Sequence, residues 1–129
     1  MQDPILKREI RNCIDVLRKG GTILYPTDTV WGIGCDATNA KAVQKVFKIK
    51  KRMESKSLIV LLDRKERLSG YISSIPAIAL DLLDSVDTPL TIIYPNAQNL
   101  AKNIIASDGT IAIRLTRFEF CYKLIRMFG

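Results

Sequence analysis

Apolar side chains near the amino terminus recur every three or four residues. They stand at Leu6, Ile10, Cys13, Ile14 and Leu17. This spacing is typical of an amphipathic helix, and Gly20-Gly21 supplies a stop signal. A second helix is predicted after Thr38 or Asn39, either of which can cap it. Similar patterns lead us to predict helices over 4–19, 40–51, 76–83 and 118–128.

Short β-favouring runs separate these helices. Strands are predicted over Thr22–Tyr25, Leu58–Leu62, Leu90–Tyr94 and Ile111–Leu115. The second run is apolar throughout, which favours a central strand covered on both faces. The segment 96–106 is predicted to form a short helix. Alternating helices and strands indicate one α/β (α+β) domain over 1–129, with a mixed twisted sheet flanked by helices.

Composition limits the class of protein. The chain has 129 residues, 47% of them hydrophobic, which suits one domain with a real core. Its formal net charge of +7 favours acidic partners such as nucleotides or nucleic acid. No apolar run approaches the roughly 20 residues of a membrane helix, and the first residues carry no export pattern. We therefore expect no membrane segment and a cytoplasmic location.

Cysteine and histidine usage narrows the chemistry. The three cysteines are scattered and form no close pair, so we interpret them as small buried apolar residues rather than zinc or disulfide ligands. The chain has no histidine, which excludes Ser-His-Asp triads and His-ligated zinc. Catalysis would have to rest on cations, hydroxyls, carboxylates and a metal held by oxygen ligands.

A polar turn and a basic cluster provide the candidate chemistry. The turn Pro26–Gly32 is rich in hydroxyl and carboxylate groups, and Lys50-Lys51-Arg52 with Lys56 closes the helix that follows. Several cations near such a turn can neutralise phosphate oxygens. Structural interpretations remain open at this point: turn residues satisfy backbone groups, and cations favour a helix carboxyl end. Arg114, at the end of an apolar strand, is equally common as an exposed cation.

Ordered motifs then carry a family resemblance. They lie at Tyr25–Gly34, Ile49–Arg52, Lys56–Val60, Thr88–Ile93 and Gly109–Arg114. In this order, over most of the chain, they resemble the YrdC family of threonylcarbamoyl-adenylate synthases. The resemblance implies a nucleotidyltransferase that condenses L-threonine, bicarbonate and ATP into threonylcarbamoyl-AMP for modification of tRNA adenosine. It also implies Mg²⁺, with no metal ligand assigned among the site residues, and downstream tRNA threonylcarbamoyl-transfer proteins as partners.

The same resemblance implies roles for individual residues. Thr29 and Arg114 correspond to the family's threonine-binding positions. Lys50 and Arg52 correspond to catalytic and ATP-binding positions, and Lys56 and Thr110 to further ATP-binding ones. Asp28 is a weaker candidate for contact with a magnesium-bound water.

Two alternatives to the enzyme stay open. A basic surface can hold tRNA or double-stranded RNA through phosphate contacts. It would comprise Lys41, Lys45, Lys48, Lys123 and Arg126. The second alternative is a truncated, non-catalytic nucleotide-binding domain. The family's Ser-x-Asn segment after the last predicted strand has no counterpart here, so we expect the domain to be incomplete at its carboxyl end and this chain to be inactive by itself.

Overall fold

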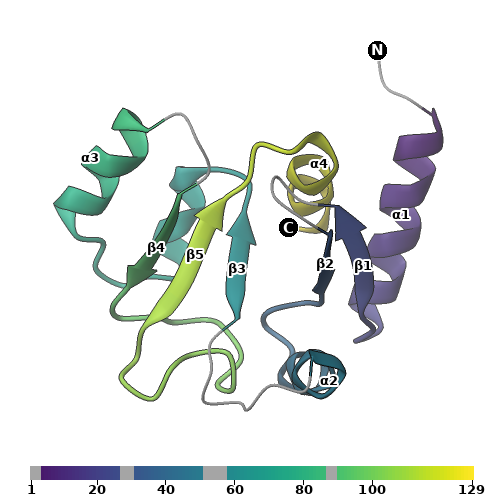
Figure 1. Cartoon of the computed structure of the whole chain (residues 1–129), viewed down its shortest axis with the longest axis horizontal. Helices are drawn as coiled ribbons and strands as arrows, with labels where there is room; N and C mark the ends of the chain where they lie inside the picture. The colour runs from purple at the N-terminus through teal and green to yellow at the C-terminus, as the bar shows by residue number, and fades with distance from the viewer. Residues whose placement is uncertain (1–3, 27–30, 51–57, 87–89) are drawn as a thin grey trace.

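The computed structural model describes residues 4–26, 31–50, 58–86 and 90–129. The helices within these ranges are α1 (Pro4–Arg18), α2 (Ala40–Lys50), η1 (a 3-10 helix, Lys65–Gly70), α3 (Ala77–Ser85) and α4 (Glu119–Phe128) (Figure 1). The four predicted α-helices are therefore confirmed. None of the helices in these ranges is both long and apolar enough to cross a membrane.

The strands form two sheets within the described ranges. Their bounds are β1 (Ile23–Pro26), β2 (Trp31–Gly34), β3 (Ile59–Leu62), β4 (Thr91–Tyr94) and β5 (Ile111–Leu115). Strands β1 and β2 pair as an antiparallel ribbon, and the larger sheet has the order β3-β5-β4. Strand β5 is parallel to β3 and antiparallel to β4, so the predicted α/β fold with a mixed sheet is confirmed.

The register of the larger sheet decides which side chains share a face. Arg114 on the central strand β5 lies opposite Leu61 of β3 and Thr91 of β4. Because side chains alternate along a strand, Ile111 and Ile113 point to the other face and are buried there. The sheet therefore has one core face and one face that carries Arg114.

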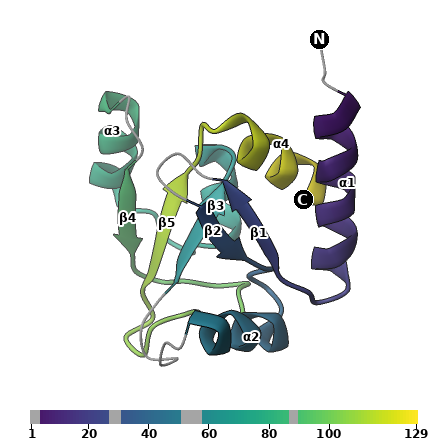
Figure 2. The same ribbon diagram turned by 45° about the vertical axis from the view of Figure 1, so that its right-hand side comes forward.

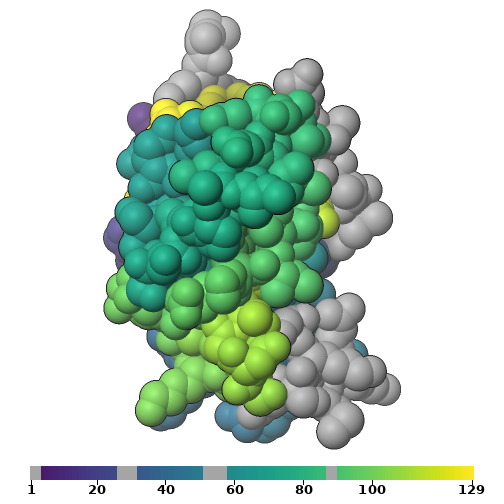
Figure 3. Space-filling model, turned by 90° about the vertical axis from the view of Figure 1, so that its left-hand side faces the viewer, coloured from purple at the N-terminus to yellow at the C-terminus, as the bar shows by residue number. Residues whose placement is uncertain are grey.

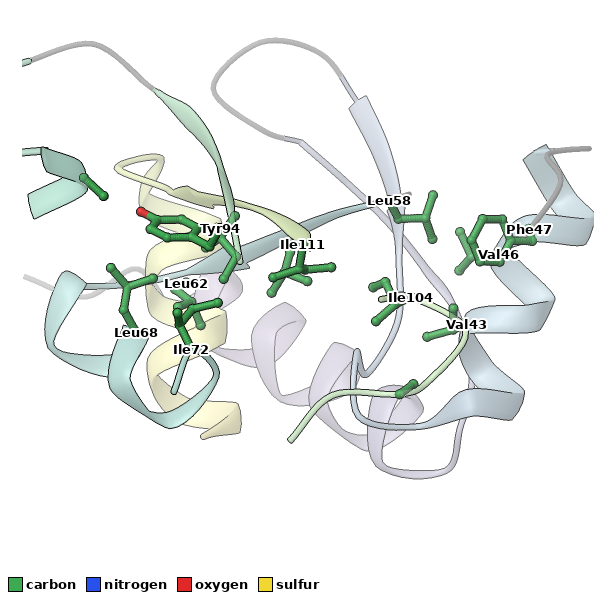
Figure 4. Packing of buried hydrophobic residues seen from close by; sticks show 14 residues of the cluster. Val43, Val46, Phe47, Leu58, Leu62, Leu68, Ile72, Tyr94, Ile104 and Ile111 are labelled. Atoms are coloured by element: carbon green, nitrogen blue, oxygen red, sulfur yellow. The ribbon is translucent and has the colours of Figure 1, made fainter. Parts of the chain in front are cut away.

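The main core lies against that buried face. Figure 4 shows Leu62 and Tyr94 packing with Leu68 of η1 and with Ile72. Helix α2 adds its apolar stripe to the same cluster, together with residues of the 101–104 segment. On the side of the molecule that Figure 3 faces, η1 and α3 form a continuous teal and green surface.

A smaller core holds the amino-terminal part in place. Ile10, Ile14 and Leu17 of α1 pack against Leu124 of α4, with Ile23 of β1 at the edge of the cluster. Figures 1 and 2 both show α1 and α4 side by side next to the β1-β2 ribbon. Helix α4, near the carboxyl end, therefore packs against α1, near the amino end, and stabilises its position.

A buried carboxylate fastens α4 to the larger sheet. The Asp63 side chain, only 1% exposed, follows β3 and pairs with Arg67, whose Nη1 lies 3.1 Å from Oδ1. The same Nη1 donates to the Ile125 carbonyl of α4 at 3.4 Å. Arg64 and Arg126 each approach Asp63 Oδ2 to 3.8 Å. This charge cluster joins the end of β3 to η1 and α4.

Two predictions about elements were wrong, and strand β2 was missed. Strand β3 is at an edge of its sheet in the described ranges rather than central, and Ile59 remains 47% exposed. The segment 96–106 forms turns instead of a helix, because Asn96 and Asn99 adopt left-handed backbone angles (φ 59° and 58°) that a helix cannot contain.

Candidate active site

A cavity of about 560 Å³ is lined by residues from both sheets. Tyr25 and Gly34 line it from the β1-β2 ribbon, and residues 58–62 line it from β3 and its approach. Lys50 enters from the end of α2 and Arg114 from β5. The fold thus brings these two cations, which stand far apart in the sequence, to one open cavity, whose lining also includes Arg18 and Arg67.

Arg114 is held by its neighbour on the next strand. Its Nε donates a 2.8 Å hydrogen bond to Thr91 Oγ1. The two residues are directly opposed in the antiparallel β4-β5 pair, where side chains of one face meet. The sheet register and this hydrogen bond therefore restrict the orientation of the guanidinium.

Lys50 reaches the cavity because of where α2 ends. Asn39 starts the helix: its side-chain Oδ1 accepts a 3.1 Å hydrogen bond from the backbone N–H of Ala42. Buried Val43, Val46 and Phe47 then fix the orientation of the helix. Lys50 is the last helical residue, is exposed, and suits the negative end of the helix dipole.

Tyr25 forms a wall of the cavity through close contact with a glycine. A Cβ placed on Gly34 would lie 2.5 Å from Tyr25 Cε1, so only glycine leaves room for the ring. Burial raises the pKa of the Tyr25 phenol to about 12, while the nearby charge of Arg114 acts in the opposite direction. Burial likewise raises the pKa of Cys35 to about 11. Both groups stay protonated at neutral pH.

The predicted site residues have different outcomes. Lys50 and Arg114 line the same cavity. Thr110 does not line it: it precedes β5, and its Oγ1 donates a 2.6 Å hydrogen bond to Asp108 in the turn. Thr110 and Arg114 are four residues apart along the strand direction, about 13 Å. Their proposed roles are not tested by this geometry.

The remaining predicted residues lie outside the described ranges. They are Asp28, Thr29, Arg52 and Lys56. Their roles therefore stay predictions from the sequence resemblance.

The described residues do not build a metal site from side chains. They contain no group of three or more acidic or cysteine side chains able to hold an ion. Asp36 lines the cavity, but its Oδ1 accepts hydrogen bonds from the Thr38 backbone N–H at 2.9 Å and from Thr38 Oγ1 at 2.6 Å. These residues do not fit a Mg²⁺ cage supplied by the protein.

The cysteine prediction is confirmed for one residue of three. Cys121 is buried, whereas Cys13 and Cys35 are half-buried, and none of the three forms a disulfide. Cys35 and Cys121 both line the cavity, where they contribute small apolar surface.

Sequence reasoning missed two residues that shape the site. Tyr25 opens the first motif and Thr91 lies within the fourth, so a signal for each was present in the sequence. Their roles required the three-dimensional contacts to Gly34 and Arg114.

The basic residues of the RNA alternative are divided between two helices. Lys41, Lys45 and Lys48 are exposed on α2, whereas Lys123 and Arg126 belong to α4. Figures 1 and 2 show α2 below and α4 above, with the β1-β2 ribbon between them. Lys123 pairs with a glutamate of its own helix, and Arg126 belongs to the Asp63 cluster. This division does not favour one continuous RNA-binding face.

A mixed sheet with a cation-lined cavity beside it defines an α/β protein suited to anionic ligands. The chain belongs to the Sua5/YciO/YrdC family, because residues 15–129 match that family, which carries the description "Telomere recombination". It is 31% identical to a threonylcarbamoyl-AMP synthase of Halorhodospira halophila and 35% identical to one of Pseudoalteromonas translucida. Each alignment covers 93% of this chain, and they cover 63% and 66% of the relatives.

A solved structure supports the fold assignment. The crystal structure of P. abyssi Sua5 complexed with L-threonine matches 95% of this chain and 36% of that chain, with a TM-score of 0.88 and 29% sequence identity. The chain thus spans less than two thirds of the length of these relatives.

Proposed function

We propose that this protein serves as a threonylcarbamoyl-AMP synthase, a nucleotidyltransferase acting on L-threonine, bicarbonate and ATP. The observation that carries the proposal is the convergence of Lys50 and Arg114 on one cavity. Relatives named threonylcarbamoyl-AMP synthase, and a structural neighbour bound to L-threonine, support the choice of substrates.

The reaction explains why two cations are needed. The threonine amine and bicarbonate form a carbamate with loss of water, and a carbamate oxygen then attacks the α-phosphorus of ATP. A phosphorus–oxygen bond forms as the bond to pyrophosphate breaks, with the two oxygens roughly in line. Both reactants are negatively charged, so the site must hold them together against their repulsion.

We assign Arg114 to the carboxylate of threonine and Lys50 to the phosphates of ATP. A guanidinium grips a carboxylate through two parallel hydrogen bonds, which fixes orientation as well as charge. An ammonium group on a flexible stem adapts to phosphate oxygens that shift during transfer. Thr29 on the threonine side, with Arg52, Lys56 and Thr110 on the ATP side, complete the proposal from the sequence motifs.

The finer details of the proposal concern metal, tRNA and location. Because the described residues do not fit a metal cage, any Mg²⁺ would arrive on the ATP phosphates with most of its water shell. The product would be passed to tRNA threonylcarbamoyl-transfer proteins, and we expect the reaction to take place in the cytoplasm.

The experiment measures pyrophosphate released from ATP by this chain extended at its carboxyl end through the segment in which the family carries Ser-x-Asn. We expect release only when L-threonine and bicarbonate are both present, and omission of either should abolish it. Calorimetric titration with L-threonine provides a second measurement that does not depend on turnover. ATP hydrolysis indifferent to threonine and bicarbonate, or absence of L-threonine binding, would contradict the proposal.

A further inference from the structure

Thr91 and Arg114 form a polar pair on the sheet face opposite the main core, and Arg114 also lines the cavity. The hydrogen bond between them, 2.8 Å from Nε to Oγ1, links the central strand β5 to β4. Leu61, opposite Arg114 on the other side, offers only an apolar side chain. The guanidinium therefore has a polar neighbour on one flank and an apolar one on the other.

This arrangement restricts how Arg114 can grip an anion. A guanidinium offers a carboxylate two forked edges, one made of Nη1 and Nη2 and one made of Nε and an Nη nitrogen. Thr91 accepts the Nε–H, so the second edge is already engaged. The end of the fork, Nη1 with Nη2, is the edge that Thr91 leaves to a ligand.

We propose that Thr91 is a positioning residue that orients the Arg114 guanidinium for an end-on, bidentate grip of a carboxylate. The identity of that carboxylate as L-threonine rests on the proposed function. Thr91 itself does not touch the ligand in this account. It acts by restricting rotation of the guanidinium, so that less orientational freedom is lost on binding.

The pair also provides a matched set of variants. Thr91→Val keeps the shape of the side chain and its preference for a strand but removes the hydroxyl. Thr91→Ser keeps the hydroxyl and removes a methyl group. Thr22→Val, at a threonine that precedes β1, is a control for the same chemical change elsewhere. Thermal unfolding of each variant establishes that it is folded.

The first measurement needs no ligand. In ¹⁵N-labelled protein, the Arg114 Nε–H resonance is identified by its absence in Arg114→Lys, and its exchange rate with water is recorded. We expect exchange about 10-fold faster in Thr91→Val, because a hydrogen bond worth about 1.4 kcal/mol is lost, and a near-normal rate in Thr91→Ser and Thr22→Val. An unchanged rate in Thr91→Val would overturn the proposal.

The second measurement uses calorimetric titration with L-threonine and with L-threoninamide, which lacks the carboxylate. Thr91→Val should weaken L-threonine binding about 10-fold and leave any threoninamide binding unchanged, and Thr91→Ser should restore the affinity. Unaltered L-threonine affinity in Thr91→Val would overturn the positioning role. If the wild-type chain bound no L-threonine while Thr91→Val still changed Nε–H exchange, the orienting contact would stand and the proposed substrate would fail.

Discussion

Arg114 and Lys50, two of the cations that line the cavity, are supported in different ways. Arg114 projects from the central strand of a sheet and is bonded through Nε to Thr91. Lys50 is the last residue of a helix and is exposed. The strand side presents a rigid planar group, and the helix side presents a single charge on a flexible stem. The difference matches the proposed ligands. A rigid guanidinium can orient a carboxylate, whereas a flexible ammonium group can stay in contact with phosphate oxygens that shift during the reaction.

Removing the guanidinium of Arg114 on β5 should have the largest effect on ligand affinity. Arg114→Gln removes the charge and the fork, and we expect L-threonine affinity to fall about 100-fold, as loss of two charge-assisted hydrogen bonds implies. Calorimetric titration measures the affinity. Arg11→Gln on the exposed face of α1 is the matched control and should bind normally. Equal affinity in wild type and Arg114→Gln would remove Arg114 from the threonine site.

The contact between Gly34 and Tyr25, which forms one wall of the cavity, should give the next largest effect when it is changed. A Cβ at Gly34 would displace the Tyr25 ring, so we expect Gly34→Ala to destabilise the fold by about 1–3 kcal/mol. Urea denaturation gives the free energy of unfolding. Gly70→Ala, where a Cβ would have no neighbour within 4 Å, should cost much less. Tyr25→Leu should relieve part of the Gly34→Ala penalty, and strict additivity of the two changes would refute the contact.

Removing the charge of Lys50 at the end of α2 should have a smaller effect on ligand affinity, and this effect should depend on salt concentration. Lys50→Gln should weaken ATP binding about 5-fold, because an exposed ammonium is partly screened. The difference in ATP affinity between the wild type and Lys50→Gln should decrease as the salt concentration rises. Lys48→Gln, two residues earlier on α2 and outside the cavity lining, is the control. Equal losses in the two variants would indicate a general charge effect rather than a site.

The smallest expected effect concerns alkaline pH. Burial raises the pKa of Tyr25 from 10.0 to about 12, so the unfolded chain loses this proton before the folded one does. The resulting contribution to stability is complete below pH 10 and is lost as the pH rises toward 12. Tyr25→Phe cannot ionise, so its unfolding free energy should fall less than that of the wild type between pH 8 and pH 11. Parallel profiles would contradict the assignment of this effect to Tyr25.

The sequence predicted the helices well because each carries an apolar stripe and an end signal. Strand β2 escaped prediction because two of its four residues are glycines, which have little strand preference. It forms as the antiparallel partner of β1. The edge position of β3 was also not predicted, because a short apolar run does not show whether one face or both faces of the strand are covered.

The site was predictable only as far as motifs reach. Arg114 became a candidate through the motif that overlaps β5, and Lys50 through the basic cluster that begins at the end of α2. The Thr91 contact depends on the register between β4 and β5, where a shift of one residue would send the two side chains to opposite faces. The Tyr25 contact depends on a close approach that the β1-β2 ribbon alone creates.

The division of labour between the two cations is tested most directly by crossed titrations. Wild type, Arg114→Gln and Lys50→Gln are each titrated with L-threonine and, separately, with ATP. The account predicts that Arg114→Gln loses L-threonine affinity and keeps ATP affinity, while Lys50→Gln shows the reverse. Loss of both ligands to the same extent in either variant, or loss of neither, would contradict it.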